Sequence, residues 1–214
     1  MTAPALSPHA HRQFMLEAVL RGAAVLAYCV LVAAIINGWR AAPERWSLLA
    51  LLVIETFTLC LLLLAREARF RDLSPTAAAS TVLATFYFVF LSLAPGRHLV
   101  PELVAVFIQG FGMVWQVWAK YTLGRSFGLL PADRGVVTSG PYALVRHPIY
   151  LGYLVSHVGF LSANFSFRNL IVLCGLYGLQ IVRMVLEERV LRGASAEYRA
   201  YSQSVRWRFV HGLY

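Results

Sequence analysis

Long apolar runs recur along this chain, and they constrain its fold more than any other feature. The hydrocarbon core of a bilayer is about 30 Å thick, so a helix that crosses it needs roughly 20 apolar residues. Four runs reach about that length, near 18–36, 46–65, 76–94 and 99–118. A polar stretch over 119–147 follows, and two shorter apolar segments come after it, near 148–163 and 169–186. The runs predict an all-α, polytopic membrane bundle of about five to six transmembrane segments.

The composition excludes most other classes of protein. Hydrophobic residues make up 59% of the chain and charged residues only 14%. A soluble domain carries roughly a quarter charged residues, and a disordered chain needs low hydrophobicity with high net charge. The three cysteines, Cys29, Cys60 and Cys174, lie far apart inside apolar runs. They therefore predict neither a disulfide framework nor a metal site.

The basic residues predict how the chain is oriented in the membrane. Cytoplasmic loops collect Lys and Arg. With the N-terminus inside, 15 of the 19 basic residues fall on the inner side, and 4 on the outer side. The outer four are Arg40, Arg45, Arg97 and Arg168. Both termini are thus expected in the cytoplasm, and a composition rich in Arg and Ala with one lysine favours a bacterial inner membrane.

The chain divides by character into two regions. Residues 1–118 are expected to form an anchor of plain helices that gives a lipophilic molecule access to the site, whereas 119–214 holds nearly all the unusual polar residues. Within it, Pro148 at a first helical position predicts a helix start whose free backbone N–H groups would favour an anion. Several basic and aromatic side chains converge there, namely Arg134, Tyr142, Arg146, His147 and Tyr150. The alternative is an interfacial belt, where Tyr and Arg are common.

A second polar cluster lies near the end of the last apolar segment. Arg183 and Glu187 are four residues apart, so they share one face of a helix. They form either an intrahelical ion pair or part of a cavity, because ionisable groups at that depth are costly. Because 148–163 is short for a span, it and 169–186 form either two crossings or a tight hairpin. A hairpin would bring both clusters into one pocket.

Other polar residues have simpler interpretations. Glu55, in the middle of a span, is expected to hydrogen-bond to a neighbouring helix, with Gln109 as its possible partner. His157 is expected to be a packing residue. The basic, aromatic segment over 197–208 predicts an amphipathic surface helix, or a lid on the pocket. No histidine pair has the i, i+4 spacing of a metal site, and no nucleotide fingerprint or Ser nucleophile motif occurs.

Three ordered motifs carry a resemblance to a known family. The first two run Val137-Thr138-Ser139-Gly140-Pro141-Tyr142 and Arg146-His147-Pro148-Ile149-Tyr150-Leu151-Gly152. The third combines Glu187-Glu188-x-x-Leu191 with Tyr198-x-x-Tyr201. Together, over about 125–208, they resemble the isoprenylcysteine carboxyl methyltransferase family, part of a wider group that includes phospholipid methyltransferases.

The resemblance implies an integral membrane methyltransferase with S-adenosyl-L-methionine bound in a cytosol-facing pocket. Its cofactor contacts would be Arg134, Gly135, Val136, Val137, Tyr142, His147, Pro148, Ile149, Tyr150 and Glu187. Arg183 and Glu187 would be the catalytic residues, and Arg183 would face the methyl acceptor. The implied acceptor is lipophilic: an isoprenylcysteine-like or isoprenoid carboxylate, with a phospholipid amine or a thiol as alternatives. No nucleic acid or metal is expected.

Two other functions fit parts of the same pattern. Membrane reductases that use NADPH resemble this family in their C-terminal half. A non-enzymatic transporter or scaffold is the third possibility, but a transporter should show repeats and polar breaks at the midplane. Here the polar residues gather at the cytoplasmic end, and no repeat is visible.

Overall fold

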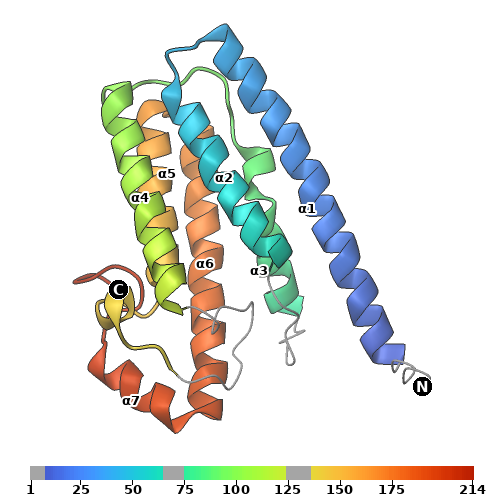
Figure 1. Ribbon diagram of the computed structural model, residues 1–214, viewed down its shortest axis with the longest axis vertical. Helices are drawn as coiled ribbons and strands as arrows, with labels where there is room; N and C mark the ends of the chain where they lie inside the picture. Colours follow the sequence, from blue (N-terminus) through green and yellow to red (C-terminus); the bar gives the residue numbers. More distant parts are fainter. Residues whose placement is uncertain (1–7, 65–74, 124–135) are drawn as a thin grey trace.

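The computed structural model describes residues 8–64, 75–123 and 136–214 (Figure 1). Seven α-helices are formed by these residues, which confirms the all-α prediction. They are α1 (Pro8–Ala41), α2 (Trp46–Leu64), α3 (Pro75–Thr85), α4 (Glu102–Leu123), α5 (Pro148–Ala163), α6 (Phe167–Ala194) and α7 (Ala196–Ser204). Two short 3₁₀ helices, η1 (Tyr87–Phe90) and η3 (Gly140–Ala143), complete the described structure.

Three helical stretches are long and apolar enough to cross a membrane, namely Gly22–Ala41, Glu102–Leu123 and Phe167–Gly193. Trp46–Cys60 is a shorter apolar helix. The helices run roughly side by side, so the bundle has two ends (Figure 1). We call the end with the α1–α2 turn and the α5–α6 turn the upper end. The end where α4 and α6 finish and α7 lies is the lower end.

The segment predicted as one span over 76–94 is not a single helix. α3 ends at Thr85, and η1 and extended backbone follow it. Side chains from other elements satisfy this irregular backbone: Arg168 Nε donates to Phe90 O at 2.8 Å, and Asn169 Nδ2 donates to Ser92 O at 3.0 Å. Non-helical backbone is tolerated at membrane depth only where protein groups satisfy it. The aromatic run before Pro95 and Gly96 hid this break from a reading of apolar content alone.

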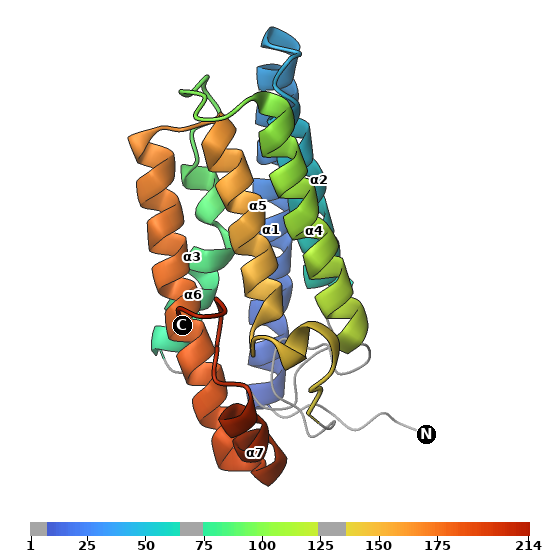
Figure 2. The ribbon, with the colours of Figure 1, turned by 90° about the vertical axis from the view of Figure 1, so that its left-hand side faces the viewer.

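The closest helix packing lies between α4 and α5, which run side by side (Figure 2). At Gly112 of α4, an added Cβ would lie 2.6 Å from Gly152 O and 2.6 Å from Ser156 N on α5. At Gly159 of α5, an added Cβ would lie 2.7 Å from Ala105 O. Small residues let helix backbones approach this closely in membranes. α5 is therefore held at a fixed height against α4, which positions its first residue.

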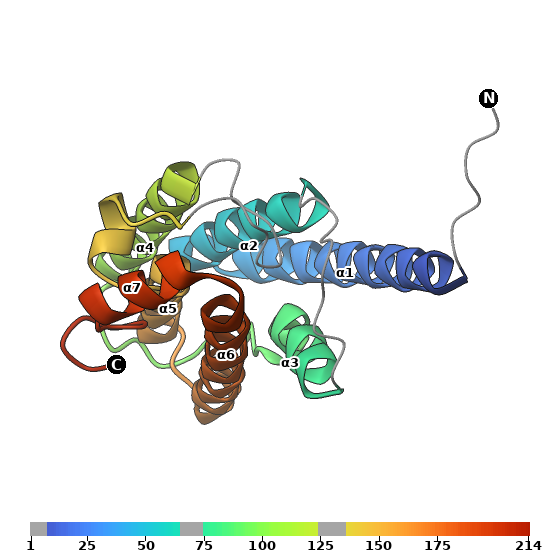
Figure 3. The ribbon, with the colours of Figure 1, turned by 90° about the horizontal axis from the view of Figure 1, so that it is seen from below.

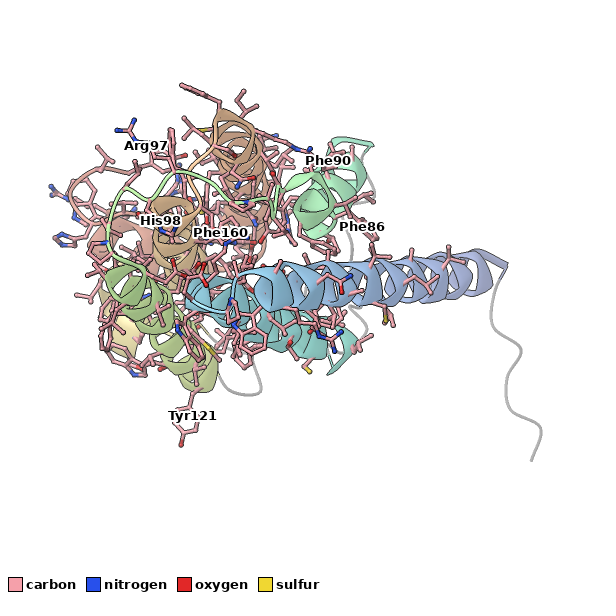
Figure 4. The ribbon with its side chains drawn as sticks, turned by 90° about the horizontal axis from the view of Figure 1, so that it is seen from above. Phe86, Phe90, Arg97, His98, Tyr121 and Phe160 are labelled. Atoms are coloured by element: carbon pink, nitrogen blue, oxygen red, sulfur yellow. The ribbon has the colours of Figure 1, made fainter. Side chains whose placement is uncertain are left out.

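A hydrophobic core fills the centre of the bundle. Phe160 of α5 is fully buried there, whereas Tyr121 of α4 is 85% exposed and points away from the helices (Figure 4). The upper end is closed by polar side chains: Arg45 Nη2 donates to Asn164 Oδ1 at 2.6 Å, and Asn164 Nδ2 donates to Ser47 Oγ at 2.9 Å. These contacts fix the turn between α5 and α6.

Candidate active site

The predicted site region lies at the lower end, where α5 begins and α6 ends. α7 and the segment after it lie beneath these two helices (Figure 3). Gly140 opens η3 with φ +59°, a left-handed conformation that favours glycine. Pro148 occupies the first turn of α5, as the sequence predicted, and its carbonyl accepts from Trp115 Nε1 of α4 at 2.9 Å.

A buried carboxylate, Glu188, is the electrostatic centre of this region. It is 2% exposed. Four cationic or ionisable side chains contact it: Arg146 Nε at 2.9 Å, His147 Nε2 at 3.2 Å, Arg192 Nη2 at 3.3 Å and Arg208 Nε at 3.1 Å. Glu188 was named only within a motif and was given no role, whereas Glu187 was predicted to contact the cofactor. The available signal was periodicity, because Glu188 follows the fully buried Met184 by four residues.

The segment after α7 closes over the start of α5. The Arg146 N–H donates to Trp207 O at 2.9 Å, and the His147 N–H donates to Arg208 O at 2.7 Å. Burial lowers the pKa of Arg208, but the hydrogen bond and charge of Glu188 outweigh it, so this pKa is raised overall. Arg208 is thus a permanent cation that ties this segment to α6.

These backbone bonds decide which N–H groups at this helix start are free. The N–H groups of residues 146 and 147 are taken by the chain itself, so they are not free for an anion. The N–H groups of Ile149 and Tyr150, one step further into α5, form no hydrogen bond with any residue that the structure describes. Any anion-binding N–H groups at this helix start are therefore those of Ile149 and Tyr150.

Arg183 and Glu187 have no ion-pair partner within the described part of the chain, and they do not pair with each other. The intrahelical ion pair that their spacing allows is not formed. Both lie close enough to Tyr150 for their charges to act on its hydroxyl. Tyr150 in turn lies beside His147, with ring centroids 5.8 Å apart. The structure therefore brings Arg183, Glu187, Tyr150 and His147 together.

The other predicted residues that the structure describes pack in one cluster. Tyr142 is buried, and its carbonyl accepts from Tyr201 Oη at 2.7 Å. Burial, followed by the charge of Glu187, raises the pKa of Tyr142, so its hydroxyl stays protonated. The cluster around it consists of Ala119, Tyr198 and Tyr201, with Val136, Val137 and Ile149 packed against it. Arg134 and Gly135 lie outside the described residues.

A second polar network lies deeper in the bundle. Tyr87 Oη donates to Glu55 Oε1 at 2.6 Å and lies 2.7 Å from His157 Nε2. Glu55 thus pairs with Tyr87, whereas the side chain of Gln109 has no hydrogen-bond partner in the described structure, which corrects the predicted Glu55–Gln109 pair. His157 is a packing residue held by hydrogen bonds, as expected. Lys120, which was not among the predicted site residues, is buried at the lower end of α4.

Most of these residues lie in a region that is similar to a known protein family. Residues 103–193 match the model of the Isoprenylcysteine carboxyl methyltransferase (ICMT) family, from α4 through α5 to the end of α6. A search of curated proteins gave no match. The family uses S-adenosylmethionine as its methyl donor. The resemblance is thereby confirmed over residues 103–193, which contain the first two motifs and the Glu187–Leu191 part of the third, and this region is similar to a family of S-adenosylmethionine-dependent membrane methyltransferases.

Proposed function

We propose that this protein transfers a methyl group from S-adenosylmethionine to a lipophilic carboxylate at the lower end of the bundle. The observation that carries the proposal is the contrast between two adjacent glutamates. Glu188 is saturated by four partners, whereas Glu187 and Arg183 have none among the described residues. Ionisable groups at membrane depth face each other or a cavity. Two unpaired, opposite charges on one helix face suit a site that receives charged ligands.

The residues present fit a zwitterionic sulfonium cofactor. The Glu187 carboxylate would accept from its amino group, and the Ile149 and Tyr150 N–H groups would donate to its carboxylate. The faces of Tyr142 and Tyr150 would lie against the sulfonium, which aromatic rings attract. His147 and Pro148 would hold this helix start in place. We assign Val136 and Val137 to the pocket wall, and we keep Arg134 and Gly135, which lie outside the described residues, as predicted cofactor contacts.

The cofactor, when bound, supplies an electrophilic methyl group. This chain has to orient an acceptor oxygen in line with that group and to exclude water. Alignment alone contributes several kcal/mol to such a displacement. Arg183 would hold the acceptor carboxylate, because a guanidinium binds a carboxylate through two parallel hydrogen bonds. A carboxylate is already deprotonated at neutral pH, so no general base is required.

We further propose that the lower end faces the cytoplasm, with both termini there, in a bacterial inner membrane. The distribution of 15 basic residues against 4 supports this orientation. The four expected outside, Arg40, Arg45, Arg97 and Arg168, all lie at the upper end. Residues 1–118 would then anchor the chain and admit the acceptor from the bilayer, and 119–214 would carry the cofactor site. In this arrangement about five to six segments cross the membrane, with α5 and α6 as the C-terminal hairpin.

The proposal is tested by calorimetric titration of the detergent-purified protein with S-adenosylmethionine, with NADPH as the comparison ligand. Wild type should bind the first and not the second. Glu187→Gln should weaken binding at least 10-fold, because the amino group loses its charged acceptor. Arg183→Gln should bind normally but transfer no tritiated methyl group to farnesoic acid in mixed micelles.

Arg189→Gln is the matched control, because Arg189 is exposed on the same helix and should change neither readout. If the protein bound NADPH alone, its function would be that of a membrane reductase rather than a methyltransferase. Binding of neither ligand would favour a transporter or scaffold. Normal cofactor binding by Glu187→Gln would refute the assigned pocket.

A further inference from the structure

Lys120 is the only lysine in the sequence, and the fold buries it. It lies in the last turn of α4 and is 8% exposed. Its Nζ donates to Tyr153 Oη at 3.2 Å. It also lies 4.5 Å from the ring centroid of Phe57 and 5.0 Å from that of Tyr153. Aromatic faces and a hydroxyl from α2 and α5 thus surround an ammonium group.

This ammonium has no carboxylate partner within the part of the chain that the structure describes. Glu55 is the acidic residue whose charge reaches it. However, Glu55 accepts from Tyr87 at 2.6 Å and lies 3.9 Å from His157 Nε2, so it forms no ion pair with Lys120. A buried cation without a counter-ion is costly, and cation–π contacts offset only part of that cost. An anion bound beside Lys120 would supply the missing partner.

Lys120 and Arg183 both reach one side chain, Tyr153. Lys120 contacts the Tyr153 hydroxyl directly, and Arg183, from α6, acts on the same hydroxyl through its charge. Tyr153 lies next to Tyr150 on α5, with ring centroids 6.4 Å apart, and Tyr150 lies next to His147. A continuous row of side chains therefore leads from the proposed cofactor site to Lys120. Cations from α4 and α6 converge on this row.

We propose that Lys120 is a second cation of the acceptor site and binds the anionic group of the acceptor together with Arg183. This inference rests on the proposed function and narrows it. The acceptor is an anionic amphiphile with its charged group near Tyr153 and its apolar part towards the bilayer. A neutral amine or thiol acceptor would leave two cations without a counter-ion in a poorly hydrated site, which disfavours it. The anion could come from a carboxylic acid or from a lipid phosphate.

The test measures ligand binding rather than turnover. Farnesoic acid and its methyl ester are titrated into the detergent-purified protein, and binding is followed by tryptophan fluorescence. Wild type should bind the acid at least 10-fold more tightly than the uncharged ester. Lys120→Met, which keeps the length of the side chain without its charge, should lose that preference while binding the ester as before. Lys120→Arg should restore the preference for the acid. Farnesyl phosphate is titrated as a third ligand, and tighter binding than that of the acid would indicate a site for a phosphate group.

Two further readouts separate the outcomes. Lys120→Met should bind S-adenosylmethionine as tightly as wild type does. If the variant no longer prefers the acid over the ester while its cofactor binding is intact, Lys120 belongs to the acceptor site and not to the cofactor site. If wild type itself binds no S-adenosylmethionine, the proposed function fails while the anion preference is still measured. The thermal midpoint of Lys120→Met should equal or exceed that of wild type, because an uncompensated charge is removed. Unchanged acid preference in Lys120→Met, or a lower midpoint with normal preference, would overturn the inference.

Discussion

The close packing of α4 on α5 makes Gly112→Ala a sharp test of the fold. The new Cβ would lie 2.4 Å from Ser156 Oγ, and 2.6 Å from both Gly152 O and Ser156 N. The hydroxyl can rotate away, but the two backbone atoms cannot, so the helices have to separate. The variant therefore perturbs the contact that sets the height of α5.

The magnitude follows from two opposing effects. Ala is favoured over Gly inside a helix by about 1 kcal/mol. Overpacking typically costs about 1–3 kcal/mol, and here backbone atoms cause it. Gly110, two residues earlier on α4, is the matched control, because an added Cβ there meets nothing within 4 Å. Gly110→Ala gains the helix preference alone, so the two variants should differ in unfolding free energy by the overpacking cost, about 1–3 kcal/mol.

Thermal unfolding in one detergent, followed by tryptophan fluorescence, measures this difference. For a chain of this size, 1 kcal/mol shifts the midpoint by roughly 2–4 °C. Gly112→Ala should therefore melt about 2–12 °C below Gly110→Ala. A Gly112→Ala protein that melts at or above Gly110→Ala would show that α4 and α5 do not approach this closely.

Two further predictions concern buried polar groups. Glu188→Ala should lower the unfolding free energy by about 3–5 kcal/mol, because the buried Arg146 and His147 lose their counter-ion. Glu187→Ala, which breaks no ion pair among the described residues, should change the unfolding free energy by no more than about 0.5 kcal/mol. If Glu187→Ala and Glu188→Ala lowered it equally, Glu188 would not be the electrostatic centre of this region. Gln109→Met should raise the unfolding free energy by about 1–3 kcal/mol, because it removes two buried amide atoms without hydrogen bonds. A midpoint below that of wild type would indicate that this amide has a partner.

The helices that could be predicted are those with a local signal at both ends. α5 spans Pro148–Ala163, the range expected from the sequence, because Pro148 fixes its start. The predicted span over 76–94 failed because its apolar content says nothing about Arg168 and Asn169, distant residues that stabilise the non-helical backbone. Hydropathy detects what can enter a membrane and not how backbone groups are satisfied there.

The candidate site shows the same division. The motifs located the region that matches the family, and they placed Pro148 in the first turn of α5. They gave Glu188 no role, because its four ion-pair contacts depend on which face of α6 is buried. The partner of Glu55 depends on η1, a turn that the apolar pattern had hidden. Tertiary contacts between distant segments therefore decided both questions.

The bonds between residues 146–147 and 207–208 bear on how the protein is made. The N–H groups of residues 146 and 147, just before α5, donate hydrogen bonds to carbonyls that lie about 60 positions later in the chain. During synthesis, α4 and α5 can pack as soon as α5 has been inserted, but this end of α5 stays open until Arg208 has left the ribosome. The membrane bundle and the region around Glu188 are thus completed at different times. A nascent chain would complete its helical bundle well before the region of the proposed cofactor site.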